Sequence, residues 1–100
     1  MQQTKIDFLN SLESLIRERK DHPVEGSYTN HLFESGIPLI VRKVGEEAVE
    51  VMVSSMEPES RTVSEAADLI YHLLVLLVER GLSLDDVAGE LEERHSASLR

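Results

Sequence analysis

The sequence predicts an all-α protein of about five helices, and three observations lead to this fold class. Apolar residues recur every three or four positions along most of the chain, and no alternating run indicates a strand. Glycine or proline stands where these periodic stretches stop. The chain has no Trp and only 4% aromatic residues, so its core must be aliphatic, which suits helices packed together.

Three helices are expected in the first part of the chain. Leu and Ile recur at helical spacing over Thr4–Lys20, which predicts the first helix. Ser27 or Thr29 can cap a short second helix, and Gly36 provides its C-terminal stop. Proline is favoured in a first helical turn, so Pro38 predicts a third helix over 38–56.

Two further helices are expected in the second part. Pro58 breaks the chain, and the most apolar helix follows over Glu59–Arg80 until Gly81 stops it. Ser83 is followed three residues later by Asp86, as in a capping box, which predicts a last helix to about Arg94.

Length and composition limit the possible functions. One hundred residues make a single domain, expected over 1–95 with a frayed tail over 96–100. The net charge of -9 argues against a nucleic-acid partner, because no basic patch is available to meet its phosphates. The chain has no cysteine, lacks the apolar core of a signal peptide and has no apolar run long enough to cross a membrane. We therefore expect a soluble, cytoplasmic protein.

Two pairs of acids stand out: Glu47 with Glu50, and Glu65 with Asp68. A separation of three places both members of a pair on one side of a helix. The alternative is that each pair belongs to the solvated side of an amphipathic helix. However, the third and fourth helices are apolar around most of their circumference, which leaves only narrow polar stripes. Such helices need neighbours on most sides, so we expect a homodimer or larger homo-oligomer in which the carboxylates meet in a partly enclosed cleft.

Four converging carboxylates repel one another unless a cation compensates them. An oxygen-only ligand set suits Mg²⁺, with Mn²⁺ as a substitute, and does not select Zn²⁺. A di-iron bundle would need Glu-x-x-His, whereas Asp68 and His72 are four residues apart. A hard metal ion bound by carboxylates points to phosphate chemistry.

These residues resemble phosphoribosyl-ATP pyrophosphohydrolase, within the MazG-like all-α nucleotide pyrophosphohydrolases. The resemblance covers about Phe8 to His95. The Glu-x-x-Glu and Glu-x-x-Asp pairs alone specify only the wider superfamily, and the Gly26–Thr29 segment narrows it to the histidine-pathway enzyme. Relatives often carry a basic residue within 39–41, where this chain has Leu-Ile-Val, so a phosphate contact there must come from elsewhere, for example Arg42. The cyclohydrolase domain that accompanies some relatives is absent, so one reaction step is expected.

The resemblance implies hydrolysis of the α–β phosphate bond of phosphoribosyl-ATP, the second step of histidine biosynthesis. It implies Glu47, Glu50, Glu65 and Asp68 as metal ligands. Glu46 would be an outer-shell or water-positioning group, and a carboxylate not saturated by metal, such as Glu47, can activate the water.

Other polar residues keep two interpretations each. Ser27, Tyr28 and Thr29 either bind phosphate or ribose, or form a helix cap with one buried ring. Lys43 either contacts phosphate or bridges to Glu47 along the helix. His72 is either a partner of Asp68 behind the metal or a packed interfacial histidine.

Two rival functions remain open from the sequence. A related enzyme can hydrolyse ordinary or damaged nucleoside triphosphates, which a substrate panel with dUTP and dCTP would reveal. A non-catalytic oligomerisation module would keep all its properties when these acids are replaced by amides.

Overall fold

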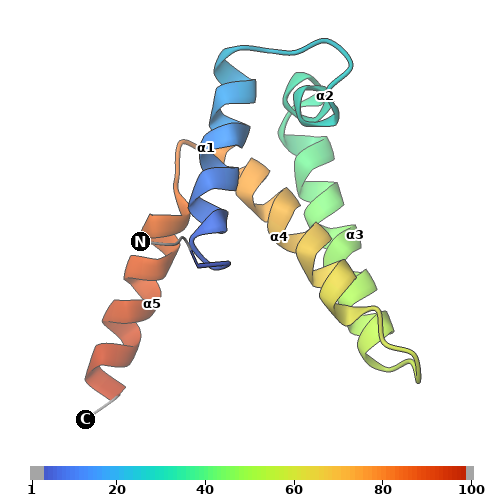
Figure 1. Cartoon of the computed structure of the whole chain (residues 1–100), viewed down its shortest axis with the longest axis vertical. Helices are drawn as coiled ribbons and strands as arrows, with labels where there is room; N and C mark the ends of the chain where they lie inside the picture. The colour runs from blue at the N-terminus through green and yellow to red at the C-terminus, as the bar shows by residue number, and fades with distance from the viewer. Residues whose placement is uncertain (1–3, 99–100) are drawn as a thin grey trace.

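The structure is a computed structural model that describes residues 4–98. Five helices follow one another in this range: α1 (Phe8–Asp21), α2 (Tyr28–Ser35), α3 (Ile37–Ser55), α4 (Thr62–Glu79) and α5 (Leu84–Ser98). No strand occurs among the described residues, so the predicted all-α class with five helices is confirmed. Figure 1 shows α3 and α4 side by side as a hairpin, with α1 and α2 against one end of it.

Local hydrogen bonds explain where the first three helices begin and end. Thr4 and Asp7 exchange backbone-to-side-chain hydrogen bonds of 3.1 and 3.2 Å, and α1 begins only after this turn, at Phe8 and not at Thr4. Ser27, not Thr29, caps α2, since its side chain accepts from the Asn30 amide. Gly36 ends α2 with a φ of 86°, a conformation that favours glycine, and α3 starts at the next residue.

The later boundaries also differ from prediction by a few residues. α4 begins at Thr62, because the segment after Pro58 forms a loop before the helical hydrogen bonds start. The predicted capping box opens α5: Ser83 and Asp86 exchange hydrogen bonds of 2.9 and 3.0 Å. α5 runs to Ser98, beyond the predicted end at Arg94 and into the expected tail. Residues 99 and 100 of that tail lie outside the described residues, and its fraying stays a prediction.

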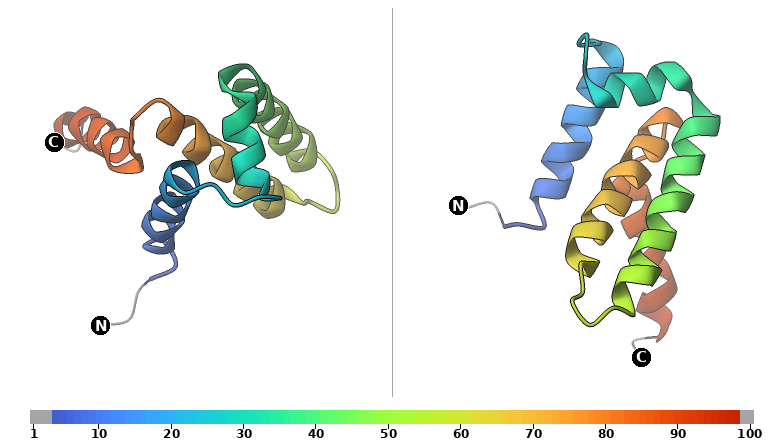
Figure 2. Two further views of the ribbon diagram at one scale, coloured as in Figure 1. Left: turned by 90° about the horizontal axis from the view of Figure 1, so that it is seen from above. Right: turned by 90° about the vertical axis from the view of Figure 1, so that its right-hand side faces the viewer.

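The core lies where α1, α2, α3 and α4 meet. It is aliphatic, as predicted, and consists of Ile16, Leu32, Ile40, Leu74, Val75, Leu77 and Val78. Each apolar side chain fully buried in this way contributes about 1.5–3 kcal/mol. The views in Figure 2 show α3 and α4 running in opposite directions, so residues in the middle of α3 face the first turns of α4. This pairing positions the acidic residues.

α5 leaves the rest of the molecule as a separate arm (Figure 1), and its side chains from Asp85 to Ser96 are exposed. Its first amide is nevertheless anchored, because the Leu84 N–H donates to the carboxylate of buried Glu13 on α1 at 2.9 Å. Arg17 donates to the same carboxylate at 2.8 Å. Glu13 on α1 therefore holds the N-terminus of α5 in place.

Large apolar side chains remain uncovered on α3, α4 and α5. They are Val41, Val49, Met52, Val53, Val63, Ile70, Leu73, Val87 and Leu91. The single chain thus leaves open the apolar faces from which we expect an oligomer. No helix within residues 4–98 is long and apolar enough to cross a membrane.

Candidate functional site

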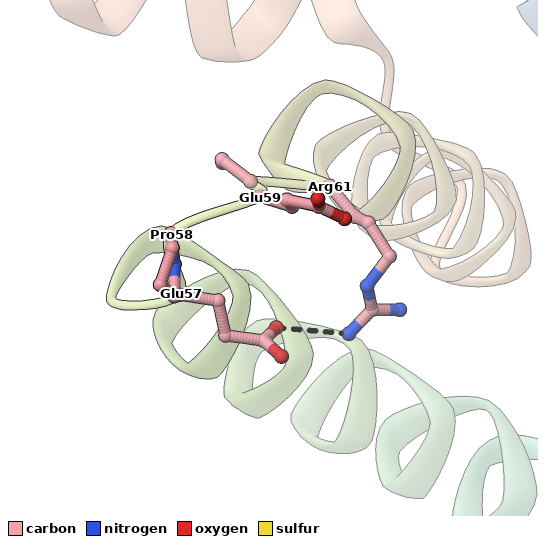
Figure 3. A pocket seen from close by; sticks show the side chains of 5 residues that line it. Glu57, Pro58, Glu59 and Arg61 are labelled. Atoms are coloured by element: carbon pink, nitrogen blue, oxygen red, sulfur yellow. Dashed lines mark hydrogen bonds and ion pairs between the residues drawn. The ribbon is translucent and has the colours of Figure 1, made fainter.

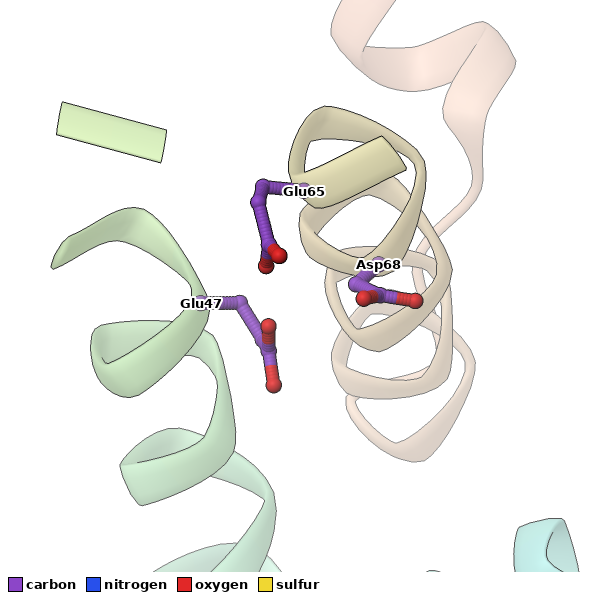
Figure 4. A group of neighbouring side chains, drawn as sticks. All are labelled: Glu47, Glu65 and Asp68. Atoms are coloured by element: carbon purple, nitrogen blue, oxygen red, sulfur yellow. The ribbon is translucent and has the colours of Figure 1, made fainter. Parts of the chain in front are cut away.

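Three acids gather between α3 and α4. One carboxylate oxygen from each of Glu47, Glu65 and Asp68 lies within 4.8 Å of the other two. Figure 4 shows Glu47 reaching from α3 toward α4, with the Glu65 carboxyl group facing it and Asp68 one turn further along α4. Glu47 and Glu65 are half-buried and Asp68 is exposed. The predicted convergence of acids from the third and fourth helices is therefore found for these three residues.

Glu50 does not join this group. Its side chain is exposed on α3, and its negative charge contributes to raising the pKa of Arg61, behind the larger contributions of Glu57 and Glu65. Both Glu50 and Glu65 thus lie within the electrostatic reach of one guanidinium. The structure brings together three of the four acids that we expected as metal ligands.

Arg61 is a residue of this neighbourhood that the sequence analysis missed. Its guanidinium pairs with Glu65 at 3.0 Å and with Glu57 at 3.1 Å. The hydrogen bond and charge of Glu57 are the main reasons why the pKa of Arg61 is raised. Figure 3 shows the ion pair of Arg61 and Glu57, two of the residues that line a hollow of about 650 Å³ at the loop between α3 and α4. The spacing of four residues on either side of Arg61 was the available signal.

Glu46 and Lys43 pair with each other and not with the acidic group. The Lys43 ammonium lies 3.4 Å from Glu46, and Arg42 lies 3.6 Å from the same carboxylate. Of the two interpretations of Lys43, the bridge to Glu47 is therefore wrong, because the ammonium pairs with the acid three residues further along the helix and not with the one four residues further. Glu46 is exposed beside Glu47, where a carboxylate can still approach a ligand.

The segment before and within the first turn of α2 is attached to α4. The Tyr28 hydroxyl lies 2.9 Å from Nε2 of His72, and the hydroxyls of Thr29 and Tyr71 are also hydrogen-bonded. Tyr28 stacks on Tyr71 with ring centroids 6.3 Å apart. Ser27 has the capping role, whereas the Tyr28 ring is 46% exposed, so the alternative of a cap with a buried ring is correct only for the cap.

His72 is buried in α4 and has two hydrogen-bond partners. Nδ1 lies 2.7 Å from the backbone carbonyl oxygen of Asp68, and Nε2 meets the Tyr28 hydroxyl. The histidine is therefore a packed residue that contacts Asp68 through its main chain.

Partial burial raises the pKa of Tyr28, and the charges of Glu46 and Glu47 act in the same direction. The charge of Lys43 opposes them. The Tyr28 hydroxyl therefore keeps its proton at neutral pH, and it lies within the electric field of the α3 acids.

Asn30 was also missed, and it orders the loop before α2. Its Oδ1 accepts from the Val24 amide at 2.6 Å, and its Nδ2 donates to the Arg19 carbonyl at 2.5 Å. A single asparagine between polar neighbours gives no sequence signal for these contacts. Together with Tyr28, the loop lines a second hollow of about 490 Å³.

Comparisons with known proteins show to which family the chain is similar. A family model described as phosphoribosyl-ATP pyrophosphohydrolase matches residues 9–95. The phosphoribosyl-ATP pyrophosphatase of Listeria welshimeri is 54% identical over 86 residues, covering 86% of this chain and 84% of that protein. The enzyme of the same name from Leptospira biflexa is 50% identical over 92 residues, covering 91% of this chain and 100% of that protein.

A longer relative is the histidine biosynthesis bifunctional protein HisIE of Caldanaerobacter subterraneus, 54% identical over 91 residues. The match covers 90% of this chain and 44% of that protein, so the chain spans less than half of the bifunctional relative. The matched region of the family model contains all three converging acids and the Tyr28 segment. The resemblance seen in the sequence is confirmed, and the chain belongs to the phosphoribosyl-ATP pyrophosphohydrolase family.

Proposed function

We propose that the chain is a Mg²⁺-dependent phosphoribosyl-ATP diphosphatase, which converts phosphoribosyl-ATP and water into phosphoribosyl-AMP and pyrophosphate. This reaction is the second step of histidine biosynthesis. The observation that carries the proposal is the family match over residues 9–95, because it includes every acid of the group between α3 and α4. The names of the Listeria and Leptospira relatives support the same reaction.

The acidic group fits a small, hard cation. Two oxygens bound to one Mg²⁺ at about 2.1 Å are at most about 4.2 Å apart. Adjacent oxygens in octahedral coordination are only about 3.0 Å apart. The oxygens of Glu47, Glu65 and Asp68 already lie within 4.8 Å of one another, so each pair has to close by at most about 1.8 Å to bind one ion. All donors are carboxylate oxygens, which suits Mg²⁺ or Mn²⁺.

When bound, the ion neutralises negative charge on the phosphate oxygens. Glu47, Glu65 and Asp68 would hold it, and Glu50 would complete the set after a change of side-chain rotamer. Glu50 is a suitable fourth ligand because it lies on the same side of α3 as Glu47 and near the same guanidinium as Glu65. In the structure as it stands, Arg61 supplies the positive charge beside Glu65.

The chain's own residues then carry the hydrolysis. A carboxylate of Glu47 or Glu46 orients the attacking water and takes its proton while the new P–O bond forms. The bond to the leaving pyrophosphate breaks in the same displacement. Glu46 is suited to the outer position, because it is exposed next to Glu47 and outside the group of three acids.

The substrate-binding residues are Ser27, Tyr28, Thr29 and Lys43. The hydrogen bonds of Tyr28 and Thr29 to α4 place this segment against the helix that carries Glu65 and Asp68. Lys43 lies on α3, one turn before Glu47, and its charge reaches the Tyr28 hydroxyl. A cation there is placed to offset negative charge of a phosphate.

The active form is a homodimer or larger homo-oligomer. α5 buries none of its side chains from Asp85 to Ser96. Val87 and Leu91 on α5 line an apolar groove with Leu77 of α4 and with Leu82 in the loop between the two helices. A helix of this length is marginally stable in water without a packing partner. A second copy of the chain would cover this groove and the apolar sides of α3 and α4. A cytoplasmic location stays a prediction from the sequence.

The direct test is hydrolysis of a substrate panel by the purified chain. We expect pyrophosphate release from phosphoribosyl-ATP with Mg²⁺, a response to Mn²⁺, and loss of activity with a chelator. Faster release from dUTP or dCTP would instead identify an enzyme for ordinary nucleoside triphosphates. Growth of a histidine-requiring strain that lacks this step, after introduction of the chain, tests the same function in cells.

A further inference from the structure

The hydrogen bonds of His72 determine the role of the Tyr28 hydroxyl. A backbone carbonyl can only accept, so the Asp68 oxygen, at 2.7 Å, requires that Nδ1 of His72 carry the ring proton. In a neutral imidazole the other nitrogen is then an acceptor. With the His72 ring neutral, the Tyr28 hydroxyl, 2.9 Å from Nε2, is therefore the donor of the hydrogen bond between them.

A phenolic hydroxyl has one proton, and in Tyr28 this proton already forms the hydrogen bond to His72. The Tyr28 oxygen is left as a hydrogen-bond acceptor for anything that approaches from outside. A phosphate group in its ionised form offers acceptors only, so it cannot bond to this oxygen. A sugar hydroxyl or an amino group can, because each has a proton to donate.

The surroundings of Tyr28 favour the same class of ligand. The hollow beside it is lined by two acids, Glu25 and Glu34, and no lysine or arginine is among its lining residues. The hydroxyl itself is reached by the positive charge of Lys43 and, less strongly, by the negative charges of Glu47 and Glu46. Inside the hollow, the two acids disfavour a phosphate and tolerate a neutral ring that carries hydroxyl groups. The volume of about 490 Å³ is within the range of small-molecule sites.

We propose that His72 is a positioning residue that makes the Tyr28 oxygen an acceptor for a hydroxyl group on a sugar ring of the substrate. The proposal rests on the function proposed above and makes it more specific. It assigns different parts of the substrate to different residues of the site. The acids between α3 and α4 serve the phosphates, whereas Tyr28 recognises the sugar.

The test compares substrate binding with binding of pyrophosphate, which has no sugar. In Tyr28→Phe we expect KM for phosphoribosyl-ATP to rise by about 3- to 10-fold, the range for one lost hydrogen bond, with kcat within about 2-fold. The inhibition constant of Mg-pyrophosphate should stay the same. A parallel rise of that constant would show that Tyr28 contacts phosphate and would overturn the proposal, as would an unchanged KM.

Variants of His72 and Tyr71 separate positioning from a structural effect. His72→Gln keeps an acceptor near the place of Nε2, so KM should return to within about 2-fold of the parent value, while His72→Asn is too short and should match Tyr28→Phe. Tyr71→Phe is the matched control, because it also removes one hydroxyl bond between α2 and α4 but leaves the Tyr28–His72 pair intact. Its KM should stay within about 2-fold.

Each outcome decides between the two proposals. If the parent chain does not hydrolyse phosphoribosyl-ATP at all, the proposed function fails. If the parent chain is active and Tyr71→Phe raises KM as much as Tyr28→Phe does, the effect is structural and only the role of His72 and Tyr28 is refuted. Because Tyr28→Phe retains the ring that stacks on Tyr71, this variant is informative even if the His72 variants do not fold.

Discussion

Replacement of Glu47 by Gln should stabilise the metal-free protein and destabilise it relative to the parent when Mg²⁺ is present. Glu47 has no ion pair among the described residues, and its carboxylate faces those of Glu65 and Asp68 within 4.8 Å. At this distance two unit charges in water repel by about 0.9 kcal/mol. Two such pairs are relieved, and after a discount for screening by salt we expect a gain of about 1 kcal/mol.

Thermal unfolding in a chelator and with excess Mg²⁺ measures both effects. A gain of about 1 kcal/mol raises the Tm of a domain of this size by roughly 4–8 °C. With the ion at 100 times its dissociation constant, the parent gains about 2.7 kcal/mol, and the variant should lose most of this gain because it lacks one ligand. The order of the two melting temperatures therefore reverses between the two conditions.

Glu92→Gln is the matched control, since Glu92 is an exposed acid on α5 that is remote from the acidic group. It should show neither effect. A Glu47→Gln protein that is less stable than the parent in the chelator would refute the reasoning, because Glu47 would then have a structural role that outweighs the repulsion.

Four further outcomes follow from the structure. Asp68→Asn should reduce kcat by about 100-fold or more with the fold intact or slightly stabilised, measured by pyrophosphate release and circular dichroism; unchanged activity would contradict a metal role. Glu13→Ala should lower the free energy of unfolding by about 2 kcal/mol in denaturant titrations, because the Leu84 amide and Arg17 lose their acceptor; a smaller loss than an exposed acid-to-Ala change would show that this anchor is unimportant. Leu91→Glu should shift sedimentation toward the monomer, and a monomeric parent would refute the proposed oligomer. The raised pKa of Tyr28 means that folding favours the neutral phenol, so the contribution of Tyr28 to stability is complete below pH 10 and is lost as the pH rises above it. The difference in unfolding free energy between the parent and Tyr28→Phe should therefore shrink above pH 10, and a constant difference would contradict this.

Local signals allowed most of the helix positions to be predicted. Gly36 ends α2, and the Ser83–Asp86 pair begins α5, through the conformation or hydrogen bonds of residues that are close together in the chain. Such helix boundaries can be predicted from the sequence. The start of α4 was predicted three residues early because Pro58 shows that a helix is interrupted, but not where the next one resumes. Its first helical turn depends on a loop whose side chains bond among themselves, including Ser60 with Thr62.

The candidate site was predictable only as far as helical spacing reaches. Spacing places Glu47 and Glu50 on one side of α3, but the rotamers and the neighbouring guanidinium decide that only Glu47 meets the α4 acids. The Tyr28–His72 bond joins residues 44 positions apart, and no periodicity within one helix can indicate it. The sequence did show the chemistry of the acids, because their residue type alone limits the cations that they can bind.

The packing of α3 against α4 must hold the acids together in the absence of a metal. Three carboxylates form three repelling pairs of at least about 0.9 kcal/mol each in water, so the group costs about 3 kcal/mol or somewhat more before screening. Ile40 on α3 and Leu74 and Val75 on α4 are buried, and each contributes about 1.5–3 kcal/mol. Apolar packing therefore outweighs the repulsion, and the Arg61–Glu65 pair reduces it further. The carboxylates are brought together by folding, so the ion does not have to assemble its own site.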